Sequence, residues 1–250
     1  MSKVIGKPYA AHMLVKAAAS APFNPAQPIT SVLFDVHSTL VDQGSSADWL
    51  QRALAKTPAD RTAINIQELE GFLDRIWENG RVLDPESSRD LSATAHAQVF
   101  NNLLAQGPTI PTELGQALYD VMLDTWHAYQ DAVPTLTALK GLGIKIGLLS
   151  NVGVSIHHVL EREGLAQLAD GIVLSCEIGV VKPNLGMFEA SLQSIGSTAA
   201  ETLMVGDSGH DDVGGTALGM RTLVLPRTRG PIHGLAAVVG LVHASQELQR

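Results

Sequence analysis

The chain has 250 residues, of which 45% are hydrophobic and 17% charged, a composition that excludes a disordered polyelectrolyte and allows a sizeable folded core. Its formal net charge is −8 at pH 7, with 25 acidic and 17 basic residues, which argues against non-specific binding to nucleic acid. A single cysteine, Cys176, excludes an intrachain disulfide, and no stretch reaches the about 18 uninterrupted apolar residues of a membrane span, so we expect a cytoplasmic protein without a membrane partner.

Residues 1–30 are predicted to form an N-terminal extension ahead of the folded core. Lysines near its start, a short apolar patch over 10–15 and the triplet Ala19-Ser20-Ala21 resemble a weak export signal. The patch is brief and is followed by Lys16, so a helix or an irregular arm is the favoured interpretation.

Five short apolar segments of strand length alternate with longer segments of helical pattern. In chain order they are SVLFDV (31–36), IKIGLLS (144–150), GIVLS (171–175), TLMVG (202–206) and RTLVLP (221–226). Residues 154–168 and 185–196 carry apolar residues at helical spacing, and Pro134 and Gly141 bound a further helix at its first turn and its end. Continuous apolar strands alternating with helices predict a Rossmann-like α/β fold in three layers, with a parallel sheet between two layers of helices.

A long helical block interrupts this alternation after the first strand. Its apolar stripes are WLQRALAK (49–56), IQELEGFLDRIW (66–77), HAQVFNNLLAQ (96–106) and ELGQALYDVMLDTWHAY (113–129), joined by the turn-like links TPADR (57–61), GRVLDPESSRD (80–90) and GPTIP (107–111). We predict a helical cap over 43–127, and a core made of 31–42 and 128–250. Such a cap would stand over the carboxyl edge of the sheet, where open α/β sheets bind their ligands.

Polar residues follow four of the predicted strands. They are Asp35, His37 and Thr39 after the first, Ser150 and Asn151 after the second, Lys182 in a loop after the third, and the acidic loop GDSGHDD (206–212) at the end of the fourth. Each group alone is more typical of a helix cap, a turn or the surface than of a site. Four groups in this order are harder to explain as turns, because parallel strands bring their carboxyl ends to one edge of the sheet.

On these residues the sequence resembles the haloacid dehalogenase superfamily of hydrolases. The first strand in that family ends in Asp-x-Asp-Gly-Thr, where this chain has Asp35-Val36-His37-Ser38-Thr39. The family's Ser-Asn, Lys and acidic Gly-Asp loop are matched by Ser150-Asn151, by Lys182 and by 206–212. The resemblance spans the core, and the helical block lies where the family's helical caps lie.

The resemblance implies a phosphatase of small-molecule phosphomonoesters that forms an aspartyl-phosphate and uses Mg²⁺. Asp35 would be the nucleophile, since a carboxylate can attack phosphorus and split hydrolysis into two easier steps. Lys182 would place a positive charge on the nucleophile and the phosphoryl oxygens. Thr39, Ser150 and Asn151 would bind the phosphoryl group.

A metal site is implied by the same resemblance. Its ligands would be the carboxylates of Asp35, Asp207 and Asp212 together with the backbone carbonyl at His37, Asp211 being an alternative to Asp212. Phosphate transfer is favoured over dehalogenation, because carbon–halogen hydrolysis needs no metal and the dehalogenase branch typically lacks paired acids in this loop. A metal-independent dehalogenase-type hydrolase and a catalytically degenerate binding or regulatory protein stay open as alternatives.

His37 replaces the aspartate that donates and accepts the proton in phosphatases of the family. Histidine can do both, because its unperturbed pKa of about 6.5 suits acid–base work near neutrality. The alternative is that His37 only fills space and leaves slow chemistry or none. Ser38 is a second departure from the pattern, since it stands where the family has glycine, which tolerates backbone conformations that serine resists.

The cap is expected to recognise the part of the substrate that is not phosphate. Its candidates are Trp49, Trp77, Trp126, Arg75, Arg81, Arg89 and His96, each more typical of packing or of solvated surface when taken alone. His210, in the acidic loop, is expected to be solvated. No motif names the substrate or the oligomeric state.

Overall fold

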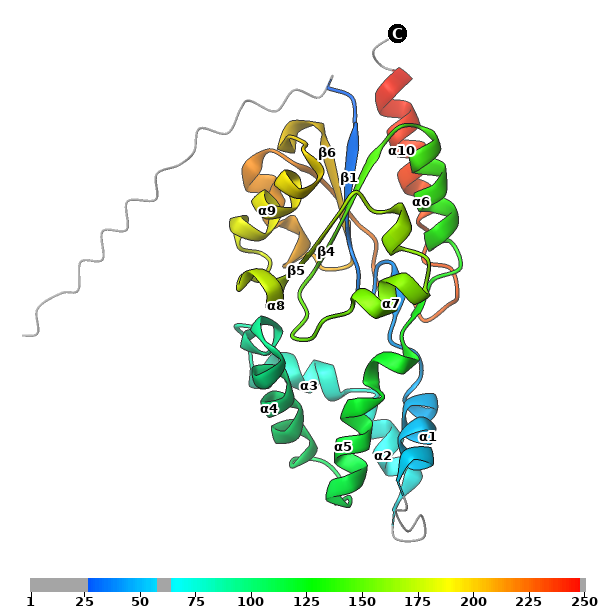
Figure 1. The fold of residues 1–250 in the computed structure, drawn as a ribbon, viewed down its shortest axis with the longest axis vertical. Coiled ribbons are helices and arrows are strands. Elements are labelled where there is room, and N and C mark those ends of the chain that lie inside the picture. Colours follow the sequence, from blue (N-terminus) through cyan, green and yellow to red (C-terminus); the bar gives the residue numbers. More distant parts are fainter. Residues whose placement is uncertain (1–26, 58–63, 248–250) are drawn as a thin grey trace, which may run out of the picture.

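The computed structural model describes residues 27–57 and 64–247. The apolar patch and the Ala19-Ser20-Ala21 triplet of the N-terminal extension therefore lie outside the described residues, as does most of the TPADR link. The described chain forms an α/β core and a helical cap beside it (Figure 1).

A five-stranded sheet forms the centre of the core, and every neighbouring pair of its strands is parallel. Its strands, in the order β5-β4-β1-β6-β7, are β5 (Gly171–Leu174), β4 (Lys145–Ser150), β1 (Ser31–Asp35), β6 (Thr202–Gly206) and β7 (Arg221–Val224). The five predicted strands are thus confirmed, and so is the α/β fold class. All five residues of β1 are buried because this strand lies in the middle of the sheet.

Side chains alternate between the two faces of the sheet, and each face packs on its own helices. On β1, Val32 and Phe34 belong to one apolar cluster and Leu33 belongs to another. The first cluster includes residues of α6 (Ala132–Gly141), α7 (His157–Arg162) and α10 (Ala236–Glu247), and the second includes residues of α9 (Leu185–Ile195). Figure 1 shows α6 and α10 on one side of the sheet and α9 on the other, the three predicted layers.

The cap consists of helices around a separate apolar cluster. They are α1 (Ser46–Lys56), α2 (Ile66–Leu73), α3 (Ile76–Leu83), α4 (Ala93–Leu104) and α5 (Thr112–Asp120), with the 3-10 turns η2 (Ser88–Leu91) and η3 (Met122–Thr125). Ser45, Asn65 and Ser92 begin α1, α2 and α4, each accepting a backbone N–H with its side chain.

Three details of the cap prediction were wrong. The predicted helix 66–77 is two helices, because the chain turns at Asp74 and Arg75 and so brings α2 and α3 onto one apolar cluster. The predicted link 80–90 begins inside α3. The helix predicted over 113–129 ends at Asp120, since the chain then pairs with the core as a short strand.

The chain leaves and re-enters the core through an antiparallel ribbon of β2 (Val41–Asp42) and β3 (His127–Ala128). Cap and core also meet away from this ribbon. The buried hydroxyl of Ser175, at the start of α8 (Ser175–Ile178), donates to the carbonyl oxygen of Asp90 in η2 at 2.6 Å. In the part of the chain that the structure describes, no helix is both long and apolar enough to cross a bilayer.

Candidate active site

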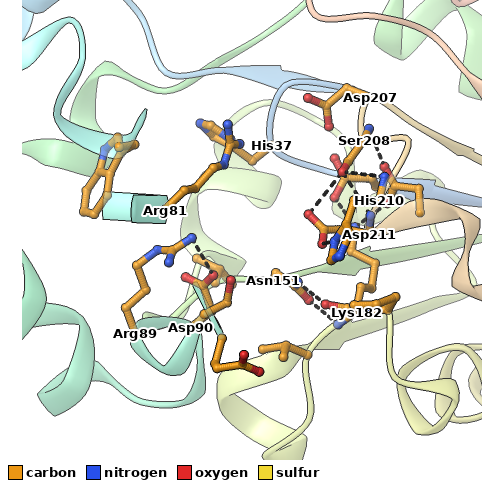
Figure 2. Close-up of a pocket in the computed structure, with 18 of the residues that line it drawn as sticks. His37, Arg81, Arg89, Asp90, Asn151, Lys182, Asp207, Ser208, His210 and Asp211 are labelled. Carbon is orange, nitrogen blue, oxygen red and sulfur yellow. Dashed lines mark hydrogen bonds and ion pairs between the residues drawn. The ribbon is translucent and has the colours of Figure 1, made fainter. Parts of the chain in front are cut away.

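A cavity of about 840 Å³ lies between the carboxyl edge of the sheet and the cap (Figure 2). Its core half includes Asp35, His37, Asn151, Lys182, Asp207 and Asp212, and its cap half includes Trp77, Arg81, Arg89, Asp90, His96 and Trp126. The strand ends therefore bring six of the eight predicted site residues to one cavity. The other two, Thr39 and Ser150, are fully buried, and their hydroxyls have no hydrogen-bond partner among the described residues.

Lys182 joins two acidic residues that are far apart in the sequence. Its Nζ lies 2.5 Å from Oδ1 of Asp35 and 2.7 Å from Oδ1 of Asp212, and all three side chains are almost completely buried. The backbone of Lys182 is held in turn by Asn151, whose Oδ1 accepts its N–H at 2.7 Å and whose Nδ2 donates to its carbonyl oxygen at 3.0 Å. Asn151, predicted to bind the phosphoryl group, thus positions the lysine with both of its polar atoms.

Negative charge outweighs positive charge at this point. Burial raises the pKa of Asp35 to about 7; Lys182 opposes this shift, while Asp212 and Asp207 add to it. Burial and the carboxylate of Asp212 also raise the pKa of Asp207. Although burial disfavours its charge, Lys182 has a raised pKa because Asp35 and Asp212 stabilise the ammonium. One ammonium among three carboxylates leaves a surplus that a cation can neutralise.

The carboxylates of Asp35, Asp207 and Asp212 fit a divalent metal ion. Each offers an oxygen, and these oxygens lie within 4.8 Å of one another. Oδ2 of Asp35 is buried and has no hydrogen-bond partner in the described chain. Hard oxygen donors of this kind bind cations such as Mg²⁺.

The acidic loop selects Asp212 rather than Asp211 for this cluster. Asp212 is fully buried, and its Oδ2 accepts the backbone N–H of Ser208 at 2.9 Å. Gly206 makes room for it, because a Cβ there would lie 2.0 Å from Oδ2 of Asp212. The carboxylate of Asp211 bonds instead to the hydroxyl of Ser208 and to the ring of His210, a ring that is 82% exposed.

His37 lies on the cap side of Asp35 (Figure 2). Its ring packs against Trp126 with centroids 4.7 Å apart, and its Nδ1 lies 3.2 Å from Oγ of Ser38. Burial lowers the pKa of His37 to about 4, with the charges of Arg227 and Arg81 adding to the effect, so the imidazole is uncharged at neutral pH. Ser38 takes a left-handed backbone conformation, with φ of +70°. Serine thus adopts the geometry that glycine favours, at an energetic cost of roughly 1–2 kcal/mol.

Five of the seven aromatic and basic residues predicted to read the substrate line the cavity. Arg89 is buried between Asp84 and Asp90, at 3.3 and 3.4 Å. Burial and the charge of Arg89 lower the pKa of His96 to about 4, and its Nδ1 lies 3.1 Å from the hydroxyl of Tyr119. The other two stand apart from the cavity wall, since Trp49 donates to Leu118 inside the cap and Arg75 is exposed on the surface.

Sequence reasoning missed three residues that shape the site. Ser208 holds Asp212 through its backbone, Arg227 bonds Asp42 at 3.3 Å near His37, and Ser175 joins the cap to the core. Ser175 and Arg227 follow β5 and β7, so a search of every strand end for polar residues would have found both. Ser208 holds Asp212 through its backbone N–H, and because every residue except proline has this group, the identity of the residue could not predict the bond.

Sequence comparison places this site within known hydrolases. Residues 29–219 match a family described as haloacid dehalogenase-like hydrolase. The chain is 29% identical to the pyrimidine 5'-nucleotidase YjjG of Escherichia coli (76% of this chain, 83% of the relative) and 30% identical to a ribulose-1,5-bisphosphate 5-phosphatase of Halopiger xanaduensis (78% and 84%). A glyceraldehyde 3-phosphate phosphatase of Methanothermobacter thermautotrophicus is 29% identical (79% and 85%).

Solved structures resemble the fold. A 2-haloacid dehalogenase from Pseudomonas syringae pv. tomato has a TM-score of 0.58 at 21% identity, covering 86% of this chain and 99% of that chain. A HAD phosphatase from Thermococcus onnurineus has a TM-score of 0.57 at 22% identity, covering 85% and 97%. At these identities the likeness is one of fold alone. The family match, which spans most of the described core and cap, shows that the chain belongs to the haloacid dehalogenase-like hydrolases.

Proposed function

We propose that this hydrolase is a Mg²⁺-dependent phosphatase of small phosphomonoesters that works through an aspartyl-phosphate on Asp35. The observation that carries the proposal is the buried cluster of Asp35, Asp207 and Asp212 around the ammonium of Lys182. The activities for which the relatives are named, on a nucleotide, a sugar bisphosphate and a triose phosphate, agree with it. We further propose a core of 31–42 and 128–250 and a cap of 43–127, since the ribbon of β2 and β3 joins them at these points.

In the first step an oxygen of Asp35 attacks phosphorus while the bond from phosphorus to the leaving oxygen breaks, and the leaving oxygen takes up a proton from solvent water to leave as an alcohol. The buried hydroxyls of Thr39 and Ser150, which lack partners among the described residues, are available to bind phosphoryl oxygens. Bound Mg²⁺ would supply positive charge against the anionic phosphoryl group, with Asp35, Asp207, Asp212 and the carbonyl of His37 as its protein ligands.

In the second step water attacks the phosphorus of the acyl-phosphate, which releases phosphate and restores the Asp35 carboxylate. The water must lose a proton, and we propose that the imidazole of His37 accepts it. The ring is uncharged and can therefore take up a proton, but its pKa of about 4, below the value of about 6.5 on which the sequence prediction relied, makes it a weak base. Trp126 and Ser38 hold that ring two residues beyond the nucleophile.

Phosphate release from phenyl phosphate, measured with Mg²⁺ and with EDTA, tests the proposal. We expect release that depends on Mg²⁺ and falls by about 10³-fold or more in Asp35→Asn, because amide nitrogen and oxygen do not replace the nucleophilic carboxylate. Asp212→Asn should abolish the response to Mg²⁺, whereas Asp211→Asn, its neighbour in the same loop, should retain it. Halide release from a 2-haloacid that persists in EDTA would instead identify a dehalogenase. Metal binding without turnover would identify a degenerate protein.

A further inference from the structure

The charged groups of the cavity are unevenly paired. Lys182 is bound by Asp35 and Asp212, and Arg89 is bound by Asp84 and Asp90.

Arg81 is the exception among these cations. Its side chain lines the cavity, yet it forms no hydrogen bond or ion pair with any residue in the described part of the chain. Glu86, in the same wall, is exposed and likewise forms no ion pair with the residues described. Figure 2 shows the guanidinium of Arg81 extending from the cap toward His37, across the cavity from Lys182 and Asp211.

The surroundings of Arg81 suit the leaving group of a substrate. Arg81 and Trp77 both lie on α3, four residues apart, so they share one face of this helix and both line the cavity. Trp77 packs on His96 at 5.0 Å between ring centroids. With the phosphoryl group at Asp35, the cap half of an 840 Å³ cavity is left for the rest of the substrate.

We propose that Arg81 selects phosphomonoesters whose leaving group carries a second anionic group, either a carboxylate or a second phosphate. This inference rests on the proposed phosphatase function and names the substrate class of that site. A planar guanidinium with no protein partner presents its N–H donors to such a group, and its geometry matches both anions bidentately. The guanidinium of Arg89 is not available to an anionic group of the substrate, because it already forms ion pairs with Asp84 and Asp90.

Kinetics of the full chain with matched esters test the inference. Phenyl phosphate has a neutral leaving group, carboxyphenyl phosphate adds a carboxylate to the same ring, and propane-1,3-diol bisphosphate, paired with propyl phosphate, adds a phosphate. In Arg81→Gln we expect kcat/KM for the doubly anionic esters to fall roughly 10- to 100-fold, the usual effect of a charge-assisted hydrogen bond, with much smaller losses for the neutral-tailed esters. The ester that loses more identifies the anion.

Arg75→Gln is the matched control, since Arg75 lies at the start of the same helix, is exposed and stands outside the cavity wall. It removes the same charge from the cap and should leave all four kcat/KM values unchanged. Equal losses with all esters in Arg81→Gln, or none with any, would overturn the inference and leave the phosphatase intact. Native protein that hydrolyses none of the four with Mg²⁺ would overturn both.

Discussion

The two halves of the cavity are built differently. In the core half, Asp35, Lys182 and Asp212 come from separate strand ends or loops, are almost fully buried and bond to one another. In the cap half, Arg81 is exposed on a helix and forms no bond within the described chain. If the proposed function holds, this difference is a division of labour, in which the buried core half carries the chemistry and the cap wall reads the substrate.

This division follows from how each half folds. The parallel sheet forces the carboxyl ends of β1, β4 and β6 to one edge, so the residues there are held by backbone pairing on both sides. The cap packs around its own apolar cluster and joins the core through a two-stranded ribbon. Residues of the cap wall can therefore change without disturbing the pairing that places Asp35.

Lys182→Met is the most severe way to break the core half. It leaves the buried carboxylates of Asp35 and Asp212 without their ammonium, so we expect kcat to fall by about 10³-fold. In EDTA the free energy of unfolding should fall by about 3–5 kcal/mol, as is typical when one partner of a buried ion pair is removed. Added Mg²⁺ should restore part of this stability. Urea unfolding with and without Mg²⁺ measures both the loss of unfolding free energy and its recovery.

Lys140→Met is its control. Lys140 forms an ion pair of similar length with Asp170, 2.7 Å, but at a partly exposed site. Surface pairs contribute about 0–1 kcal/mol, so this variant should lose little stability and no activity. If added Mg²⁺ restored none of the unfolding free energy lost in Lys182→Met, the ammonium of Lys182 and the metal ion would not neutralise the same carboxylates.

His37→Ala tests whether the core half also supplies the proton acceptor. We expect kcat to fall about 10²-fold, within the usual range for general acid–base help, while KM changes little. His37→Asp restores the family's residue and should recover activity. His210 lies at the exposed rim of the same cavity, so His210→Ala should change kcat little. Unchanged kcat in His37→Ala would support a role in packing against Trp126 alone.

The residues of the core half could be predicted from the sequence because each is identified by its position at the end of an apolar strand. Asp35, Ser150 and Asp207 each follow or end an apolar strand, and parallel strands deliver such residues to one edge wherever they lie in the chain. The position of Asn151 followed in the same way. The hydrogen bonds between Asn151 and Lys182 could not be predicted. They join a side chain to the backbone of a residue 31 positions away, so they depend on the path of the chain between the two.

The cap half could not be resolved in this way. Helical periodicity identifies an apolar face but not which polar residue faces a ligand, so Arg75 and Arg81 were equivalent candidates. The turn at Asp74 and Arg75 leaves Arg75 at the start of α3, outside the cavity wall, whereas Arg81 lies in the last turn of α3 and lines the cavity. No local signal marks that turn, because it is set by the packing of α2 and α3 in the cap.

Gly153→Ala tests whether the two halves of the cavity depend on each other, because Gly153 lies where the core contacts the cap. A Cβ on Gly153, in the core, would lie 2.1 Å from the carbonyl oxygen of Arg89 and 2.6 Å from Cβ of His96, both in the cap. The cap must shift to relieve this overlap, which should lower the free energy of unfolding by about 1–3 kcal/mol. Since Asp35 and Lys182 lie on the core side, we expect KM to rise more than kcat falls.

Gly141→Ala provides the reference for this last prediction. A Cβ at Gly141, near the end of α6, meets no described atom within 4 Å beyond its own helix and chain neighbours, so alanine there should be neutral or stabilise by up to about 1 kcal/mol. If Gly153→Ala lowered kcat for phenyl phosphate as strongly as His37→Ala, the cap would be part of the catalytic centre. A change confined to KM would mean that the core half keeps its geometry when the cap is displaced, because backbone pairing in the sheet, and not contact with the cap, holds Asp35 in place.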